Sequence, residues 1–528
     1  MERDRGSRDE RFGVSMVSDV LHQILDSARR SPDHVAVRDA DVSLTYGELT
    51  EMSGRVAAAL TVRGVVTGNR VVLLLQNSID YVVAAMASMW IGAIFVPLDA
   101  TDPVQRLASL LRDCQPTLVI TNGVMDESSL PEDLASVEFV SVAQLHEEQV
   151  DAVGTLPIDE RPSYIIYTSG TTGTPKGVVI GSGAFESAVS ACSFARGVDA
   201  ATTTLCVSPF HFDGSFATLF TTLTCGGTLI VRPRESLLFA RVFFNTVLAE
   251  SVTYTGFTPS YLRLLASNPQ FDKLRGSALE VIAMGGEALT VSDVEKVWSV
   301  APGVRVFNGY GPTETTITVS QMEVTPTVVS RGVIPIGKPN PGAQFYLVDE
   351  GGHPIEDDHV PGELYIGGGQ LMNGYWASPA LTDKVIRSDV IVGQRVYKTG
   401  DIVYRDSAGD FVYVNRADRV IKRGGVRISL LEITDAFCRN GDVNAAASVA
   451  FDNGGNLGIV TFVEVTSMTS PAELHRGVGE FLPPTMLPDR ICVVESIPLT
   501  SSGKTDERRL LSEVGLDPWA PTPTSPKP

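Results

Sequence analysis

The segment at residues 167–177, Tyr-Thr-Ser-Gly-Thr-Thr-Gly-Thr-Pro-Lys-Gly, constrains the fold of this chain more than any other stretch. Apolar residues at 164–166 and 178–180 flank it, and each run predicts a buried strand. Glycines let a loop backbone approach a bulky anion closely, and backbone N–H groups and hydroxyls can then donate hydrogen bonds to that anion. Lys176 at the exit adds a positive charge. The segment therefore predicts a polyphosphate-binding loop between two strands.

This loop is not a Walker A motif, in which four residues separate the first glycine from Gly-Lys-Ser/Thr. Here Pro175 precedes the lysine and Gly177 follows it, and the next residues predict a strand instead of a helix. The alternative is a hairpin turn without a ligand, which would be the better interpretation of a shorter Gly/Ser loop. The length and composition of this segment, with a lysine at its exit, favour phosphate binding.

Strand-like and helix-like segments alternate through the first part of the chain. Strands are predicted at residues 71–75, 94–96 and 117–120, with helices between them at residues 81–90 and 103–112. This order and spacing predict parallel βαβ units and an α/β architecture. After residue 330, short β-like runs predict a small β subdomain, and the residues from about 418 onward predict a separate C-terminal unit.

The composition excludes some classes of function. Aspartate and glutamate outnumber lysine and arginine by 62 to 42, and the net charge of −20 opposes nonspecific binding to nucleic acids or anionic membranes. The six cysteines are scattered without Cys-x-x-Cys spacing, which predicts reduced thiols in a cytoplasmic protein and no disulfides or zinc site. Residues 1–11 lack the apolar core of a secretion signal. The apolar residues 81–98 are short for a membrane span and predict a buried helix followed by a strand.

Residues 167–177 resemble the phosphate-binding signature of the adenylate-forming superfamily, which includes acyl-CoA synthetases, luciferases and nonribosomal-peptide adenylation domains. Seven further segments resemble other signature blocks of that family and follow the same order. They are residues 44–49, 92–99, 285–289, 308–314, 397–401, 415–422 and 498–506. The resemblance implies an α/β fold with a large N-terminal domain of layered subdomains plus a small β subdomain. It also implies a small, mobile α+β C-terminal domain that is joined by a hinge.

Composition at the two termini and the resemblance between them divide the chain into four parts. These are a disordered N-terminus at residues 1–12, an ATP- and amino-acid-binding core at 13–417, a mobile C-terminal domain at 418–515 and a disordered tail at 516–528. Asp418 matches the hinge residue of the family. Asn415, Ser429 and Leu431 stand where the family usually has glycine, glutamate and glycine. These departures concern the thioester-forming conformation more than the adenylation step.

The same resemblance assigns roles to single residues. Catalytic roles fall to Lys176, which assists pyrophosphate, to Glu314, which supplies a hard oxygen to Mg²⁺, and to Lys504, which bridges the substrate carboxylate and the α-phosphate. Tyr310 can offer a flat face to a purine, and Asp401 can accept hydrogen bonds from two ribose hydroxyls. The full set expected at ATP is Thr168, Ser169, Gly170, Thr171, Thr172, Gly173, Gly285, Gly286, Glu287, Asn308, Gly309, Tyr310, Gly311, Thr313, Asp401 and Arg416.

Phe212-Asp213-Gly214-Ser215 resembles the peptide-synthetase adenylation domains, in which this aspartate binds the α-ammonium group of an amino acid. A buried carboxylate needs a cationic partner, which an amino acid supplies and a fatty or aryl acid does not. The substrate pocket implied by local alignment consists of Asp213, Gly214, Ala217, Gly256, Ile282, Met284, Gly309, Ile317, Thr318 and Lys504. Because four of these are glycine or alanine and most others are apolar, we expect a bulky, neutral, aromatic amino acid and not glycine, alanine or an acidic one.

The expected cofactors are ATP and Mg²⁺, and the expected partner is a separate carrier protein with a phosphopantetheine thiol. No Gly-Gly-x-Ser carrier site follows the last block, which predicts a free-standing domain. Some relatives also need a small activator protein. One alternative is a carboxylic acid–CoA ligase, against which Asp213 argues. Another is a non-catalytic binding homologue, which the intact Glu314, Asp401 and Lys504 oppose.

Overall fold

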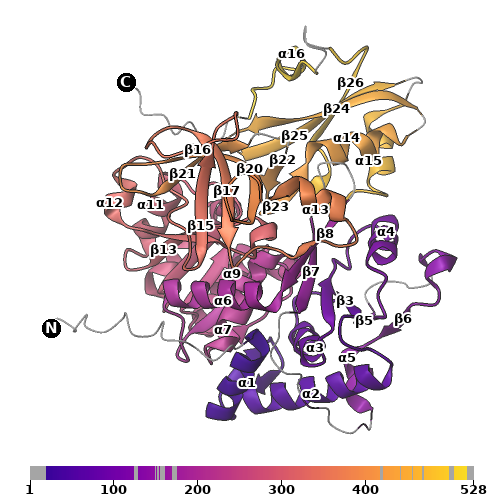
Figure 1. Cartoon of the computed structure of the whole chain (residues 1–528), viewed down its shortest axis with the longest axis vertical. Helices are drawn as coiled ribbons and strands as arrows, with labels where there is room; N and C mark the ends of the chain where they lie inside the picture. Colours follow the sequence, from indigo (N-terminus) through magenta and orange to yellow (C-terminus); the bar gives the residue numbers. More distant parts are fainter. Residues whose placement is uncertain are drawn as a thin grey trace.

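The computed structural model describes residues 19–123, 129–148, 150, 154, 161–168, 175–416, 420–440, 442–454, 456–465, 469–498 and 505–519. In Figure 1 the chain forms a large body, and the C-terminal unit lies on top of it in light orange and yellow. Within the described residues, the large body contains three sheets, and the C-terminal unit contains a two-stranded and a three-stranded sheet. The predicted fold class, with a large N-terminal and a small C-terminal domain, is confirmed.

The first sheet carries the predicted βαβ units. Its strand order is β18 (Gly374–Tyr375), β8 (Lys176–Gly181), β7 (Pro162–Thr168), β4 (Ile94–Pro97), β3 (Arg70–Leu74), β5 (Leu118–Thr121) and β6 (Glu138–Val140). Strands β3, β4 and β5 are parallel, and α3 (Ile79–Trp90) and α4 (Val104–Cys114) connect them. The strands and helices predicted between residues 71 and 120 are confirmed.

The second sheet contains six parallel strands. Its order is β14 (Ser320–Val324), β13 (Arg305–Tyr310), β12 (Val281–Gly285), β11 (Tyr254–Phe257), β9 (Thr203–Cys206), β10 (Thr228–Ile230), β1 (Val35–Arg38) and β2 (Ser43–Thr45). Strands β9, β11, β12 and β13 run parallel to one another. Their carboxyl ends therefore meet at one edge of the sheet, which is where ligands bind in open α/β sheets.

Helices fill the space between these two sheets and cover their outer faces. The inner helices are α1 (Val20–Arg30), α2 (Tyr46–Val62), α3, α5 (Val142–Glu147), α6 (Ser182–Arg196) and α7 (Phe216–Thr224). The outer face of the second sheet packs against α8 (Arg234–Leu237), α9 (Ala240–Ala249), α10 (Pro259–Ala266) and α11 (Val291–Val300). Val71 and Leu73 face the inner helices, and Val72 and Leu74 face α4, so strand β3 is buried on both sides.

The predicted β subdomain after residue 330 is the third sheet. It contains β16 (Pro354–Ile355), β15 (Ala343–Val348), β17 (Gly362–Gly368), β20 (Val396–Arg405), β19 (Ile386–Arg387) and β21 (Phe411–Arg416), with α12 (Pro326–Val329) and α13 (Pro379–Val385) nearby in sequence. The C-terminal unit consists of the hairpin β22 (Val420–Arg423) and β23 (Val426–Ser429), helices α14 (Leu430–Cys438), α15 (Pro471–Val478) and α16 (Glu507–Glu513), and strands β24 (Val443–Asn453), β25 (Asn456–Val465) and β26 (Arg490–Val494).

One predicted disordered segment is partly wrong. The predicted tail starts at residue 516, but residues 516–519 pair with the C-terminal sheet. The backbone N–H of Asp452 donates to the carbonyl of Asp517 at 2.9 Å, and Phe451 forms a β-bridge with Pro518. The reason is that β24 is an edge strand with backbone groups available for pairing. Residues 1–12 and the hinge residue Asp418 at the predicted domain boundary lie outside the described residues.

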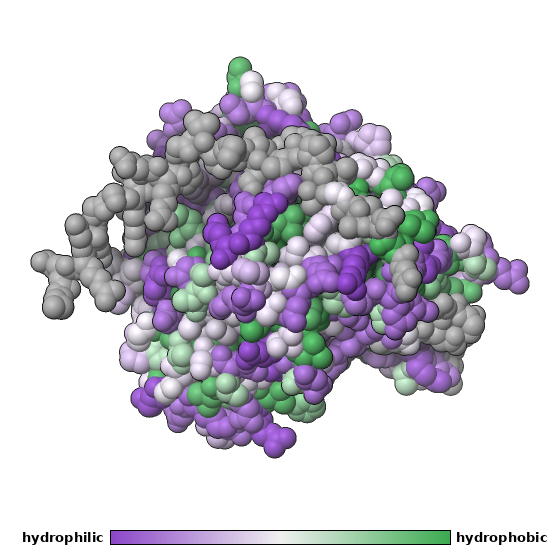
Figure 2. All heavy atoms as spheres, turned by 90° about the horizontal axis from the view of Figure 1, so that it is seen from below, coloured by the Kyte–Doolittle hydropathy of each residue, from purple (hydrophilic) through white to green (hydrophobic). Residues whose placement is uncertain are grey.

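The surface agrees with the composition of an ordinary globular protein. In Figure 2, hydrophilic and hydrophobic side chains are interspersed over the face seen from below. No helix in the described part of the chain is both long enough and apolar enough to cross a membrane.

Candidate active site

A cavity of about 440 Å³ lies between the large domain and the C-terminal unit. The carboxyl ends of β11, β12 and β13 line one side, the residues leading into α7 line another, and the hairpin β22–β23 lines a third. Thr168, the last residue of β7, also lines it. The start of the predicted phosphate loop therefore lies at the edge of the cavity that the parallel strands form.

Most residues expected at the amino-acid substrate line this cavity. They are Asp213, Gly214, Ala217, Gly256, Met284, Gly309, Ile317 and Thr318. The glycines admit neighbouring side chains as well as a ligand: a Cβ atom at Gly256 would lie 2.8 Å from Thr218 Cγ2, and one at Gly309 would lie 3.1 Å from Thr318 Cγ2. The small residues therefore allow close packing, and only part of the space they leave is open to a substrate.

The prediction that Ile282 lines the pocket is wrong. Successive residues of a strand point to opposite faces of the sheet, and Ile282 belongs to the apolar cluster beneath α9, α10 and α11. Its neighbour Ala283 faces Tyr254 and Phe307 on the other side of the sheet and lines the cavity. Met284 shares the face of Ile282 and still lines the cavity, because it lies nearer the carboxyl end of β12. Alignment of the motif alone does not reveal how far the cavity reaches along the strand.

Asp213 supplies a carboxylate to the cavity. Its Oδ2 atom is buried and accepts no hydrogen bond from any described residue. Burial raises the pKa of this carboxyl to about 6, hydrogen bonding from Thr313 opposes the rise, and the charge of Glu314 adds to it. A buried carboxylate in this state gains free energy from a cationic group on a ligand.

Arg196 also lines the cavity and is a charged residue outside the set expected at the substrate. Helix α6 ends at Arg196 because Gly197 adopts φ +71°, a left-handed conformation that favours glycine. The arginine is only 3% exposed, and its Nη1 donates to the carbonyl of Ala217 at 2.7 Å and to the hydroxyl of Tyr254. A single arginine at the end of a helix carries no motif, and only the packing of α6 against β11 and α7 places it here.

Three residues expected at the nucleotide, none of which lines the cavity, form one buried cluster. The hydroxyl of Tyr310 donates to Asp401 Oδ2 at 2.5 Å, and Arg416 Nη1 donates to Asp401 Oδ1 at 2.6 Å. Arg416 also donates through Nη2 to the carbonyl of Thr399 at 2.9 Å. Burial and the charge of Asp401 raise the pKa of Tyr310, so its hydroxyl stays protonated. The structure thus brings together residues that are 91 positions apart in the sequence.

The predicted metal ligand Glu314 is connected to the predicted phosphate lysine through Tyr375. The hydroxyl of Tyr375 donates to Glu314 Oε1 at 2.7 Å, and Lys176 Nζ lies 5.1 Å from the centroid of the Tyr375 ring. Glu314 is 2% exposed. This contact orients Glu314 and places the exit of the phosphate loop beside it.

The other residues expected at ATP divide into two groups. Gly285, Gly286, Gly309, Gly311 and Thr313 line the cavity. Asn308 does not line it and instead donates through Nδ2 to the carbonyl of Pro335 at 2.8 Å. Glu287 also does not line it; its Oε2 accepts from the backbone N–H and hydroxyl of Ser260 at 2.9 and 2.5 Å, and its Oε1 accepts from the N–H of Gly425 at 3.2 Å. Glu287 therefore ties the large domain to the C-terminal hairpin.

Several predicted residues lie outside the described part of the chain. They are Ser169, Gly170, Thr171, Thr172, Gly173, Asp418 and Lys504. Pro498 and Thr505, the nearest described residues on either side of Lys504, do not line the cavity. Lys422 of the hairpin does line it, with Nζ 5.6 Å from the centroid of the Tyr310 ring.

The two domains contact each other at two further points. Arg106 of α4 pairs through Nη1 with Glu432 of α14 at 2.9 Å, and Glu432 is 4% exposed. At the second point, a Cβ atom at Gly286 would lie 3.1 Å from the Cα atom of Gly425. Both contacts hold the C-terminal unit against the rim of the cavity.

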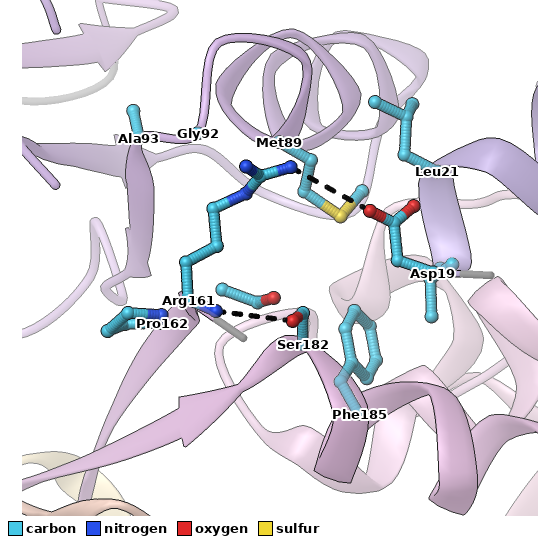
Figure 3. A pocket seen from close by; sticks show the side chains of 11 residues that line it. Asp19, Leu21, Met89, Gly92, Ala93, Arg161, Pro162, Ser182 and Phe185 are labelled. Atoms are coloured by element: carbon cyan, nitrogen blue, oxygen red, sulfur yellow. Dashed lines mark hydrogen bonds and ion pairs between the residues drawn. The ribbon is translucent and has the colours of Figure 1, made fainter. Parts of the chain in front are cut away.

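A second, much smaller cavity of about 20 Å³ lies between α1, α3 and the start of β7 (Figure 3). Arg161 Nη2 lies 3.9 Å from Asp19 Oδ2, and the N–H of Arg161 donates to the hydroxyl of Ser182 at 3.4 Å. A space of this size holds about one water molecule. These contacts anchor the start of α1 and leave no room for a substrate.

Comparison with known proteins identifies a matching family and several relatives. Residues 24–376 match the AMP-binding enzyme family. Surfactin synthase subunit 1 from Bacillus subtilis (strain 168) is 32% identical over 500 residues, which cover 92% of this chain and 14% of that protein. Tyrocidine synthase 3 from Brevibacillus parabrevis is 31% identical over 507 residues, covering 93% of this chain and 8% of that protein. The chain spans only a seventh or less of these relatives.

Solved structures share the fold over nearly the whole chain. PA1221, an NRPS protein containing adenylation and PCP domains, has a TM-score of 0.81 at 25% identity, covering 94% of this chain and 84% of that one. The o-succinylbenzoate CoA synthetase MenE from Bacillus subtilis has a TM-score of 0.82 at 21% identity, covering 93% of this chain and 98% of that one. At that identity, the likeness to MenE shows the fold alone.

Proposed function

The chain belongs to the AMP-binding enzyme family, and from this premise we propose that it activates an amino acid as aminoacyl-AMP, using ATP and releasing pyrophosphate. Its similarity to surfactin synthase subunit 1 and tyrocidine synthase 3, and to a protein with adenylation and PCP domains, supports this branch of the family.

The observation that carries the proposal is the state of Asp213. Its Oδ2 atom is buried at the wall of the cavity and has no hydrogen-bond partner among the described residues. A carboxylate in such a position is stabilised by a cation. The α-ammonium group of an amino acid provides that cation, whereas a simple carboxylic acid would leave Asp213 unpaired. The geometry therefore favours an amino acid over other acids.

In the proposed reaction, the carboxylate of the amino acid attacks the α-phosphate of ATP and pyrophosphate leaves. Asp213 holds the α-ammonium group, and the cluster of Tyr310, Asp401 and Arg416 holds the nucleoside. Lys176 offsets negative charge on the departing phosphates, and Lys504 offsets charge between the carboxylate and the α-phosphate. These residues hold the two reactants in one complex and orient them, so a bimolecular reaction becomes effectively unimolecular.

Mg²⁺ at nucleotide sites takes one or two protein carboxylates together with the phosphates. Glu314 is the carboxylate that we propose, and its hydrogen bond from Tyr375 fixes its orientation. Among the described residues, no group of three or more histidines, cysteines and carboxylates could hold a metal ion by itself. The metal would therefore bind together with the nucleotide and neutralise phosphate charge there.

We also propose that the aminoacyl group passes to the phosphopantetheine thiol of a carrier protein. The similarity to PA1221, which contains adenylation and PCP domains, supports such a partner. For the side chain of the substrate, the glycine and alanine positions favour a residue larger than alanine. The expectation of a bulky side chain therefore stays a prediction. The expectation of a neutral side chain is opposed by Arg196, whose guanidinium lines the cavity.

The test is ATP–pyrophosphate exchange over a panel of amino acids and simple carboxylic acids. Exchange that depends on amino acids alone supports the proposal. Exchange with simple acids instead indicates a carboxylic acid–CoA ligase, and exchange with no acid indicates a non-catalytic homologue. The Lys504→Ala variant should lose most exchange while its circular dichroism spectrum stays unchanged; retained exchange would refute the role given to Lys504.

A further inference from the structure

We propose that Arg196 selects the substrate, and that the amino acid this protein activates carries a side chain that ends in a carboxylate. This inference rests on the proposed function and names the substrate class for the same cavity.

The guanidinium of Arg196 lies at the wall of the cavity beneath two small residues. Its Nη1 donates to the carbonyl of Ala217, and its Nη2 lies 3.9 Å from the position that a Cβ atom on Gly309 would occupy. Both Ala217 and Gly309 line the cavity, as does Arg196 itself. Larger residues at these two positions would separate the guanidinium from the cavity.

The charge of Arg196 has no anionic partner in the described part of the chain. No salt bridge joins its guanidinium to a described carboxylate, and Nε and Nη2 donate to no described residue. Its two acceptors are a backbone carbonyl and the hydroxyl of Tyr254, and burial raises the pKa of Tyr254 to about 12, so that hydroxyl stays neutral. A guanidinium that is 3% exposed and unpaired costs folding free energy, and an anionic ligand would offset this cost.

Asp213 and Arg196 together place two opposite charges in one cavity without joining them. No salt bridge connects the two residues, and Asp213 lies four residues before Ala217, whose carbonyl accepts the hydrogen bond from Arg196. Asp213 opens a 3-10 turn, Asp213–Ser215, that runs directly into α7, so it lies about one turn before Ala217. An amino acid with its ammonium group on Asp213 and a side-chain carboxylate on Arg196 would neutralise both charges.

A neutral aromatic side chain fits this end of the cavity less well. An aromatic ring can stack on the face of a guanidinium. The N–H groups of Nε and Nη2 lie in the plane of the guanidinium, however, so stacking would leave them without acceptors. A carboxylate accepts two parallel hydrogen bonds from this edge.

The first experiment uses the wild-type protein in ATP–pyrophosphate exchange. The panel contains aspartate, glutamate and 2-aminoadipate, the carboxamides asparagine and glutamine, and phenylalanine and tryptophan. We expect kcat/KM for the best acidic amino acid to exceed that of its carboxamide by about 100-fold, as is typical when one partner of a buried charge pair is removed. A preference for carboxamides or aromatic residues would overturn the inference while leaving amino-acid activation intact. Exchange with no amino acid would overturn the proposed function as well.

The second experiment uses the Arg196→Met variant. We expect it to lose the preference for acidic substrates, so that the ratio of acid to carboxamide falls about 100-fold, while its affinity for ATP stays unchanged. Arg196→Lys should retain part of the preference because it keeps the positive charge.

The matched control is Arg305→Met. Arg305 donates to the carbonyls of Ala195 and Arg196 at the end of the same helix but does not line the cavity. We expect this variant to keep the wild-type substrate ratio. If Arg196→Met loses activity equally on every substrate, Arg196 has a structural role and the inference is overturned. If this variant does not fold, the wild-type substrate panel still tests the inference.

Discussion

Two parts of the candidate active site differ in how their buried charges are paired. At the end that we assign to the nucleotide, which lies outside the cavity lining, Asp401 is paired with Arg416 and accepts a hydrogen bond from Tyr310. At the amino-acid end, Asp213 Oδ2 and Arg196 Nε have no partner among the described residues. A paired cluster stabilises the fold before any ligand binds, whereas unpaired charges reduce stability and become favourable when a ligand completes them.

The difference separates residues that stabilise the fold from residues that select a ligand. Residues of the paired cluster hold the small β subdomain together, because Asp401 and Arg416 come from adjacent strands β20 and β21. Residues at the unpaired end contribute to recognition at the expense of stability. Substitutions at the two ends should therefore have opposite effects on folding and different effects on catalysis.

The largest expected effect on stability is at the paired end. Asp401→Ala leaves Arg416, which is 7% exposed, without its carboxylate. We expect the free energy of unfolding to fall by about 3–5 kcal/mol in urea denaturation. The matched control is Glu323→Ala, which breaks the exposed pair with Arg305 and should cost less than about 1 kcal/mol. Equal, small effects of the two substitutions would remove the distinction between the two ends.

The largest expected effect on activity alone is at the unpaired end. Asp213→Asn keeps the shape of the side chain but removes the charge that pairs with the ammonium group. We expect kcat/KM for the amino acid to fall by about 100- to 1,000-fold in pyrophosphate exchange. The dissociation constant for ATP should stay within about twofold, because the nucleoside cluster is unchanged. A variant with normal kcat/KM would show that Asp213 does not bind the substrate.

The pH dependence of activity should report the same carboxyl group. Burial raises the pKa of Asp213 to about 6 in the free protein, so the group becomes protonated and neutral as the pH falls below that value. We expect kcat/KM for the amino acid to decrease about tenfold between pH 7 and pH 5. The ratio of wild-type kcat/KM to that of Asp213→Asn should decrease in parallel, and a constant ratio would contradict the assignment.

The smallest expected effect is a gain in stability. The pKa of Asp213 in the folded protein lies above its ordinary value, so the ionised carboxylate destabilises the fold above about pH 6 and this cost vanishes below about pH 4. Asp213→Asn should therefore raise the free energy of unfolding by about 1 kcal/mol at pH 8 and by nothing at pH 4. A loss of stability at pH 8 would show that Asp213 is paired within the fold.

Short motifs predicted the paired end of the candidate site better than the unpaired end. Tyr310 and Asp401 each stand in a contiguous block whose composition indicates its role, and the fold brings the two blocks together. The layered α/β architecture was also predictable, because strands β3, β4 and β5 and their helices follow a regular hydrophobic pattern.

The errors at the unpaired end have a common physical cause. Arg196 reaches the cavity from the end of α6, and only tertiary packing against Ala217 and Tyr254 determines that position. Ile282 and Met284 lie on the same face of β12, and only the position of the cavity at the carboxyl end of the strand decides that Met284 lines it and Ile282 does not. The position of Glu287, which binds Gly425 of the other domain, likewise depends on how the two domains meet.

The contact between Gly286 and Gly425 has a consequence for the construction of chimeric proteins. The backbones of the two domains meet here without side chains between them, and Glu287 accepts the N–H of Gly425 beside this point. A C-terminal unit transplanted from a relative would need glycine at the position of Gly425 and a hairpin of the same length. A mismatched graft would fold as two separate parts and leave the rim of the cavity open.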